Sequence, residues 1–115
     1  MKGARVIKEY QSKYPETMVF KKGEYVQRDV KESMWKGWVW CYNNEKIYRW
    51  VPKHYLKSTQ DKQNGHVLLK EYNAKELSVI KGDKLMLLYE ESDWAWARNQ
   101  KGEQGWIPLE NIQIE

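Results

Sequence analysis

The sequence contains little cysteine, proline and phenylalanine, and it has no long apolar run. Its one cysteine, Cys41, excludes a disulfide within the chain and favours a reducing, cytoplasmic setting. The apolar segments are too short to cross a membrane, and the basic start MKGARVIKEY has no apolar signal core. We therefore expect no leader and no membrane partner.

Tryptophan and tyrosine are, by contrast, abundant, because the 115 residues include seven Trp and eight Tyr against one Phe. These side chains combine a large apolar ring with a polar group, so they favour half-exposed contact surfaces. A chain of this length forms one ordinary domain or two very small ones. The composition therefore indicates small folded units with an aromatic binding surface. The alternative is that the large rings fill the thin cores of small β domains.

Charge is divided unevenly along the chain. Residues 1–60 carry 13 Lys and Arg against 6 Asp and Glu, whereas residues 61–115 carry 7 against 10. A basic half beside a mildly acidic half is consistent with binding to nucleic acid or another anionic surface, with attraction between the halves, or with ordinary solvated surface.

One pattern occurs twice in the chain. The matching segments are VIKEY (6–10) with LLKEY (68–72), FKKGE (20–24) with VIKGD (79–83), Trp38 with Trp94, and Pro52 with Pro108. The offset between the copies falls from 62 to 59 and then to 56 residues. The second copy has therefore lost residues at two places, and the spacing elsewhere is constant. This pattern is typical of a duplicated β module whose loops have shortened.

The segments around these anchors are short and rich in β-branched and aromatic residues, and Gly, Asn, Pro and charged turns separate them. No segment shows a helical period. The polar segment STQDKQNG (58–65) has the composition of a linker. We therefore predict an all-β protein with a first domain at residues 1–57, a linker at 58–64 and a second domain at 65–115.

The anchors resemble those of the Src-homology-3 (SH3) domain, whose pattern is an ALYDY strand, LSFKKGD, WW and G-Y-I-P-x-x-Y-V. The first copy has VIKEY, MVFKKGE, GWVWC and RWVPKHYL, and the second has LLKEY, LSVIKGD, DWAWA and GWIPLENI. The layout is similar to the variant SH3 domains of small bacterial proteins. The resemblance implies two tandem SH3-like five-stranded small barrels that bind peptides, catalyse no reaction and need no cofactor.

The resemblance also implies an aromatic groove for an extended, proline-rich-like peptide of a protein partner, because such a peptide loses little entropy when it docks on flat rings. In the first copy the matching residues are Tyr10, Trp38, Trp50, Pro52 and Tyr55, with Trp35 near the edge of the groove. In the second copy, which we expect to bind more weakly, they are Tyr72, Trp94, Trp106 and Pro108.

Five residues modify this expected groove. Lys8 and Lys70 stand where the family has the first Tyr of ALYDY, and Asn111 replaces the last Tyr in the second copy. Glu76 keeps the family's acidic position in the second copy, whereas the first copy has only the adjacent Glu16. The first copy is therefore the better candidate for binding, and its basic character favours an acidic ligand.

The tryptophans at alternate positions of two strands share one face of each strand. Trp40 and Trp96 lie beside the groove residues Trp38 and Trp94 on the outward face. The inward residues are then Val39, Cys41, Ala95 and Ala97. Trp40 and Trp96 have no counterpart in the family, and three interpretations remain: a longer groove, a contact between modules or chains, and rings covered by Lys stems.

Two other functions stay open. A basic, aromatic-rich face can bind nucleic acid, and the first copy supplies Lys8, Lys21, Lys22, Arg28, Lys31, Lys36, Arg49 and Lys53. The modules can instead act as a structural scaffold by docking on each other, as a monomer or with weak self-association. We expect no metal site, because His54 and His66 have no cysteine pair near them, and we expect Cys41 to be an inert core residue.

Overall fold

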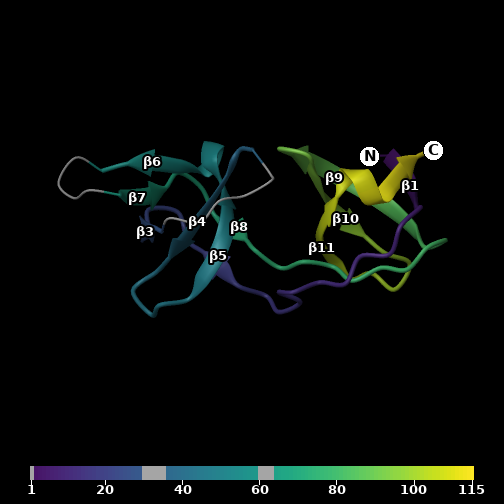
Figure 1. Cartoon of the computed structure of the whole chain (residues 1–115), viewed down its shortest axis with the longest axis horizontal. Coiled ribbons are helices and arrows are strands. Elements are labelled where there is room, and N and C mark those ends of the chain that lie inside the picture. Colours follow the sequence, from purple (N-terminus) through teal and green to yellow (C-terminus); the bar gives the residue numbers. More distant parts are fainter. Residues whose placement is uncertain (1, 30–35, 60–63) are drawn as a thin grey trace. The chain divides into compact units, whose positions relative to one another are not determined.

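The computed structural model describes residues 2–29, 36–59 and 64–115, which contain strands and two short 3-10 helices but no α-helix. The elements up to residue 58 are β1 (Lys2–Val6), β2 (Val19–Phe20), β3 (Tyr25–Arg28), β4 (Trp38–Tyr42), β5 (Tyr48–Pro52), η1 (Lys53–Tyr55) and β6 (Leu56–Ser58). Those that follow are β7 (Gly65–Leu68), β8 (Tyr72–Asn73), β9 (Lys84–Glu91), β10 (Trp94–Arg98), β11 (Gln104–Pro108), η2 (Leu109–Asn111) and β12 (Ile112–Ile114). The predicted all-β class is confirmed (Figure 1).

The chain forms two compact units, and one of them is built from two separate segments. Unit 1 consists of Met1–Thr17 and Lys75–Glu115, and unit 2 consists of Met18–Ala74. These limits differ from the predicted linker at residues 58–64. The predicted linker separates the two copies of the sequence repeat, whereas the unit limits separate the two compact units. The chain passes between the units within the loops that follow Tyr10 and Tyr72.

Unit 1 contains a five-stranded antiparallel sheet with the order β11-β10-β9-β1-β12. Strand β1 comes from the first sequence copy, and the other four strands come from the second. Ala4 of β1 lies opposite Leu85 of β9 on one side and Ile114 of β12 on the other.

Unit 2 contains the corresponding sheet, with the order β5-β4-β3-β7-β6. Here β7 comes from the second copy and lies between β3 and β6 of the first, with Tyr25 opposite Val67 and Leu56 opposite Leu68. A further two-stranded pairing joins β2 to β8, with Phe20 opposite Tyr72.

Hydrogen bonds at equivalent positions show that β1 and β7 have exchanged places. Gly82 N–H donates to the Val6 carbonyl (2.8 Å), and Gly23 N–H donates to the Leu68 carbonyl (2.7 Å). Both glycines have the positive φ expected of these turns, +96° and +83°. Each turn therefore holds the edge of a strand from the other copy. The two segments share the residues K-E-Y and carry apolar side chains at the two preceding positions.

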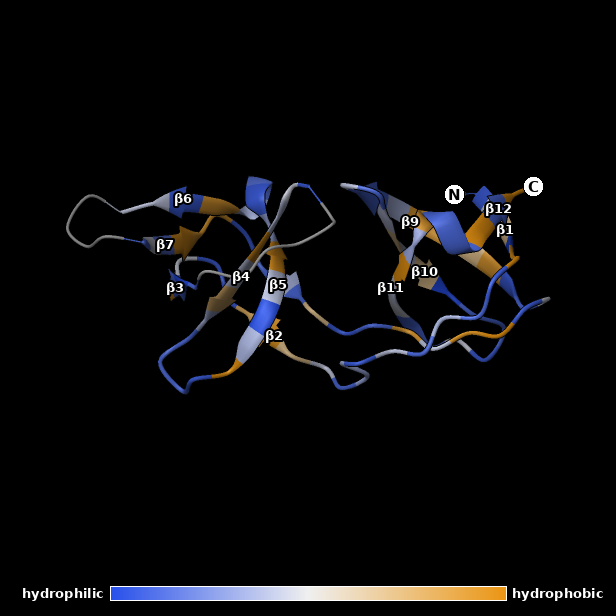
Figure 2. Ribbon diagram, in the orientation of Figure 1, coloured by the Kyte–Doolittle hydropathy of each residue, from blue (hydrophilic) through white to orange (hydrophobic). Residues whose placement is uncertain are grey.

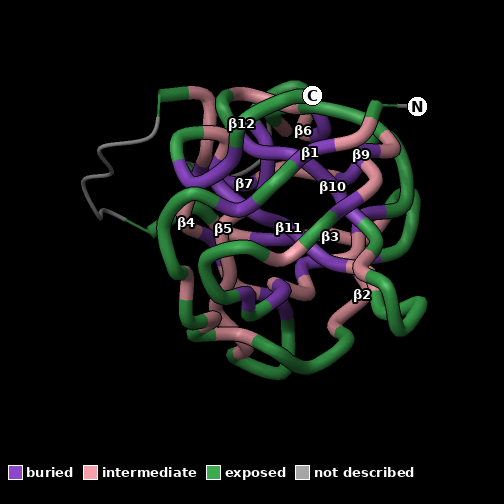
Figure 3. The backbone as a smooth tube through the Cα atoms, turned by 90° about the vertical axis from the view of Figure 1, so that its right-hand side faces the viewer, coloured by how far each residue is buried: buried purple, intermediate pink, exposed green. Residues whose placement is uncertain are grey.

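Apolar residues gather on the strands and the connecting loops are mainly hydrophilic (Figure 2). Buried residues likewise follow the strands, whereas exposed residues follow the loops (Figure 3). The core of unit 1 comprises Ala4, Val6, Leu77, Val79, Leu85, Leu87, Ala95, Ala97, Ile107 and Ile112. Buried apolar residues of unit 2 include Phe20, Val26, Val39, Cys41, Val51 and Leu68. The inward facing expected of Val39, Cys41, Ala95 and Ala97 is confirmed.

Candidate aromatic groove

The strand exchange regroups the residues expected to line the two grooves. Tyr10 lies in unit 1, beside Trp94 of the second copy, and Tyr72 lies in unit 2, beside Trp38 of the first. Each tryptophan therefore contacts the tyrosine of the other copy's KEY segment. The sequence alone gave no signal of this pairing, because both copies carry the same residue at this position.

In unit 2 the aromatic cluster comprises Trp38, Pro52, Tyr55 and Tyr72. The ring of Tyr72 lies 6.4 Å from that of Trp38 and 5.4 Å from that of Tyr55, which it meets edge to face. Tyr55 and Tyr72 are 6% and 3% exposed, whereas Trp38 is half-buried. Pro52 lies opposite Trp38 across the β4–β5 hairpin. Trp38 is thus the ring of this cluster with the most surface open to a ligand.

Backbone and ring contacts fix the position of Tyr72. Its hydroxyl donates to the carbonyl of Trp50 (3.0 Å). Phe20, which the sequence analysis did not assign to the groove, stacks on Tyr72 at 6.3 Å with an interplanar angle of 18°. Tyr72 is therefore held by β8, by the partner strand β2 and by the backbone of β5.

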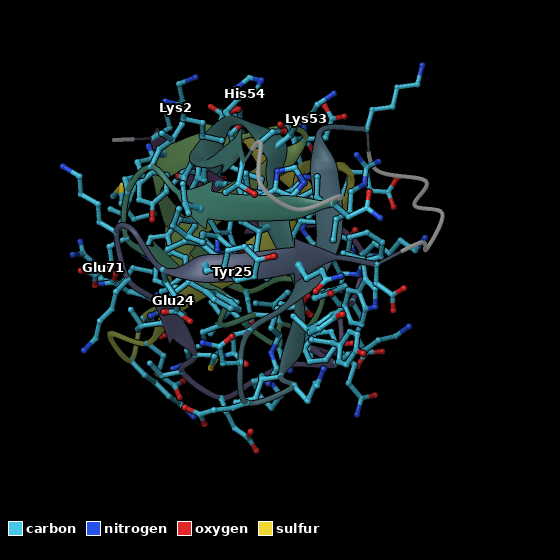
Figure 4. The ribbon with its side chains drawn as sticks, turned by 90° about the vertical axis from the view of Figure 1, so that its left-hand side faces the viewer. Lys2, Glu24, Tyr25, Lys53, His54 and Glu71 are labelled. Atoms are coloured by element: carbon cyan, nitrogen blue, oxygen red, sulfur yellow. The ribbon has the colours of Figure 1, made fainter. Side chains whose placement is uncertain are left out.

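A lysine ammonium contacts this cluster. The ammonium of Lys70 is 4.0 Å from the centre of the Tyr55 ring, within the range of a cation–π contact. Lys53 and His54 extend from η1 away from the strands and are exposed (Figure 4). Lys70 thus places a positive charge against the Tyr55 ring, at the position where the resemblance led us to expect a tyrosine.

Unit 1 contains the equivalent cluster in a more closed form. Tyr10 meets Trp94 edge to face at 5.7 Å, and Trp94 is only 8% exposed. The Tyr10 hydroxyl donates to Glu76 Oε1 (2.6 Å), which also accepts the Lys13 N–H (3.3 Å). Burial, the hydrogen bond to Glu76 and the charge of that carboxylate raise the pKa of Tyr10. Glu76 therefore serves an internal contact of unit 1 at this oxygen.

Asn111 takes a structural position in unit 1. Its side-chain amide donates to the carbonyls of Lys8 and Glu9, at 3.1 Å each, and the residue is buried. The amide thereby holds the end of the exchanged segment where the family has a groove tyrosine. Lys8 itself is exposed.

Trp106 and Trp50 occupy equivalent positions but differ in burial. In unit 1 a segment of the chain adds to the β11 edge: Trp106 N–H donates to the Lys75 carbonyl (3.0 Å), and Leu77 N–H donates to the Trp106 carbonyl (3.1 Å). Gly105 permits this approach, because a Cβ there would lie 2.8 Å from the Leu77 nitrogen. Trp106 is consequently 2% exposed.

In unit 2 the residue equivalent to Gly105 is Arg49, and Trp50 remains half-buried. The unit also lacks Glu16, which belongs to unit 1 and is exposed there. Trp35, expected at the groove edge, falls outside the described residues. The aromatic cluster of unit 2 therefore comprises Trp38, Pro52, Tyr55 and Tyr72, with Trp50 next to it.

An open hollow of about 610 Å³ lies on unit 1 and shares Tyr10 with the aromatic cluster of that unit. Its described lining includes Tyr10 and Ile80 together with the carboxylates of Glu9, Asp83 and Glu103 and the ammonium groups of two lysines. Its lining carries both acidic and basic side chains, so the hollow presents no single charge to a ligand.

The remaining reactive side chains have structural surroundings. Cys41 is fully buried, and burial raises the pKa of its thiol to about 12, so the thiol stays protonated and unreactive. Burial and the charge of Arg28 lower the pKa of His66. Within the described ranges no three His, Cys, Asp or Glu side chains are placed to hold a metal ion. No helix in the same ranges has the length and apolar character needed to cross a bilayer.

Comparison with known proteins gives one family match. The family model of the SH3 domain matches residues 70–109, which include β8, β9, β10 and β11. The match follows the sequence copy rather than the compact unit, since residues 70–74 lie in unit 2. No curated protein and no solved structure matches the chain. SH3 domains are non-catalytic interaction modules that bind proline-rich peptides. Residues 70–109 are therefore similar to an SH3 domain, and the match supports a protein-interaction module as the general class of this protein.

Proposed function

We propose that this protein is a non-enzymatic interaction protein that binds an extended peptide segment of a protein partner through the groove of unit 2. The observation that carries the proposal is the cluster of Trp38, Pro52, Tyr55 and Tyr72, in which two buried tyrosines support a half-buried tryptophan. Flat, preformed aromatic surfaces of this kind suit a polyproline II segment. The cluster of unit 1 is a weaker second site, because Trp94 and Trp106 are already buried.

Both sequence copies enter this proposal as SH3-like modules that have exchanged their first strands. The equivalent hydrogen bonds of Gly23 and Gly82 and the same strand order in both units support a second module of this type. A lone, buried cysteine accords with a reducing cytoplasmic setting. The protein would act as an adaptor that needs no cofactor.

The test is a two-dimensional amide NMR titration of the full chain with a pool of proline-rich peptides. Binding at the groove should shift the amides of Trp38, Tyr55 and Tyr72. The Trp38→Ala variant should weaken binding at least about tenfold while the other amide signals stay dispersed. Ile80→Ala is the matched control, because Ile80 is a large apolar residue that is 60% exposed and lies in unit 1. Unchanged binding by Trp38→Ala would refute the groove assignment.

Nucleic-acid binding is the second candidate, and the charge of unit 2 favours it. Residues 18–74 contain eleven Lys and Arg against six Asp and Glu, a balance of +5. Such a surface with exposed rings can track phosphates and stack bases. Shifts of Lys21, Arg28 and Lys36 amides with short single-stranded DNA, weakening steeply with salt, would favour this function over peptide binding.

A further inference from the structure

A second set of aromatic residues continues from the groove along the outer face of the β4–β5 hairpin. Trp40 lies opposite Trp50, and Tyr42 lies opposite Tyr48. Their rings touch in sequence: 5.0 Å between Trp40 and Trp50, 5.8 Å between Trp40 and Tyr48, and 4.8 Å between Tyr42 and Tyr48. All four side chains are half-buried. We call these four residues the outer ladder.

The fold itself does not require the outer ladder, because unit 1 builds the same hairpin differently. The positions equivalent to Tyr42 and Tyr48 are Arg98 and Gln104. Gln104 accepts a hydrogen bond from the Trp96 indole (2.8 Å), and Tyr89 stacks on the other side of Trp96 at 6.2 Å. Unit 1 thus closes its tryptophan pair with its own side chains, whereas unit 2 presents two further rings.

The outer ladder adjoins the groove. Trp38 and Pro52 form the first facing pair of the hairpin, and Tyr42 and Tyr48 form the last. Four residues along a strand span about 13 Å, since each residue rises about 3.3 Å. A polyproline II peptide rises about 3.1 Å per residue, so about four residues beyond the groove would cover this distance. A ligand whose chain follows the hairpin beyond the groove would therefore need about four further residues to reach Tyr42.

Positive charge lies at both ends of this continuous aromatic surface. Lys70 Nζ is 4.0 Å from the Tyr55 ring at the groove end, and Lys46 Nζ is 4.7 Å from the Tyr42 ring at the ladder end. Unit 2 as a whole carries the balance of +5. A ligand with carboxylates at corresponding positions would gain contact with these ammonium groups, whereas a basic peptide would be repelled.

We propose that the outer ladder binds the continuation of the groove peptide and that this continuation is acidic. The inference rests on the proposed function of unit 2 and adds to it the length and the charge of the ligand. Tyr42 and Tyr48 give the ring surface, and Lys46 gives the charge that selects carboxylates. Trp40 and Trp50 form the neighbouring facing pair, and Trp40 contacts the rings of Trp50 and Tyr48.

The test compares three synthetic peptides by calorimetric titration of the full chain. One contains a seven-residue proline-rich core, the second adds four residues with two glutamates, and the third replaces those glutamates by lysines. We expect the acidic extension to tighten binding about tenfold over the core and the basic extension to give no gain. The matched variants are Tyr42→Gln/Tyr48→Gln, whose second change copies Gln104 of unit 1, and Tyr89→Gln, which alters an exposed tyrosine of unit 1.

The outcomes separate the inference from the proposed function. The inference is supported if the double variant binds the core as the unaltered chain does but loses the gain from the extension, while Tyr89→Gln keeps it. It is overturned if the double variant keeps the gain, or if the lysine extension tightens binding equally. In both of those results the proline-rich core peptide still binds, so the proposed binding of a peptide to the groove is not refuted. If the core does not bind to the unaltered chain, or if oligothymidylate alone shifts the Tyr42 and Tyr48 amides, the proposed function fails and the inference fails with it.

Discussion

The exchange of β1 between the two copies leads to a sharp prediction for Val6→Ala. Val6 is 1% exposed and belongs to the core of unit 1, with Leu85, Ile107 and Ile112. If β1 remained with its own sequence copy, the same substitution would instead affect the barrel that contains Val39. The position of the destabilisation therefore reports which barrel holds β1.

The expected magnitude follows from the two methyl groups that are removed. Their transfer from the core to water costs about 0.8 kcal/mol each, and the cavity left behind adds to this. We expect a loss of about 2 kcal/mol in the free energy of unfolding of unit 1. This corresponds to about a thirtyfold change in the ratio of folded to unfolded molecules.

The assay is native-state hydrogen exchange of the full chain with amide chemical shifts from the same spectra. In Val6→Ala the amides of Leu87 and Ile107 should lose protection and shift, while those of Val39 and Val51 should keep their positions. Leu68→Ala is the mirror control, because Leu68 is 2% exposed in the exchanged strand of unit 2. It should give the opposite pattern.

Two results would refute the strand exchange. In one, Val6→Ala shifts the amides around Val39 and Val51 and leaves Ile107 unchanged. In the other, Leu68→Ala disturbs Ile107 rather than Val39. If both units lose protection equally, the amide chemical shifts show which unit contains the altered strand. Changes in chemical shift stay close to the altered contact even when unfolding is cooperative.

Three further predictions follow from single positions. Gly105→Ala should lower the free energy of unfolding of unit 1 by about 1–3 kcal/mol in urea, because the added Cβ would meet the Leu77 backbone. The Cys41 thiol, with a pKa of about 12, should react with a disulfide reagent at pH 8 at least about a hundredfold more slowly in the folded than in the urea-unfolded chain. The pKa of His66 is lowered by burial and Arg28, so below about pH 6.5 the unfolded state binds more protons and stability should fall as the pH drops, a slope that His66→Gln should reduce.

Each of these predictions has a control. Gly3→Ala should leave stability nearly unchanged, because a Cβ at Gly3 meets nothing within 4 Å, and equal effects of Gly3→Ala and Gly105→Ala would contradict the steric argument. Rapid labelling of Cys41 in folded protein would show that the barrel opens readily. His54→Gln, at an exposed histidine, should preserve the acid slope that His66→Gln reduces.

Much of the local structure could be predicted from the sequence because its signals are short-range. The hairpin of β10 and β11 follows from the alternation in WAWAR and the turn residues after it. The positive φ at Gly23 and Gly82 follows from the turn that each one forms. The inward facing of Cys41 and Ala97 follows from strand alternation and small size.

The burial of the outward tryptophans could not be predicted in the same way. Trp96 and Trp40 stand at equivalent places, yet Trp96 is 8% exposed and Trp40 is half-buried. The difference depends on Tyr89, which stacks on Trp96, and on Gln104, which bonds to its indole. Neither of these two contacts produces a periodic pattern in the sequence from which it could be predicted.

The sequence by itself determined the duplicated β pattern, the positions of the strands and the residue types of the aromatic groove. These properties depend on side-chain alternation, turn chemistry and spacing, which act within a few residues. Only the tertiary structure decided which copy supplies each first strand, and hence that Tyr72 rather than Tyr10 joins Trp38. VIKEY and LLKEY have the same pattern of apolar, charged and aromatic residues, so the pattern alone does not assign either segment to a barrel. The choice between them rests on long-range strand pairing, which no local pattern encodes.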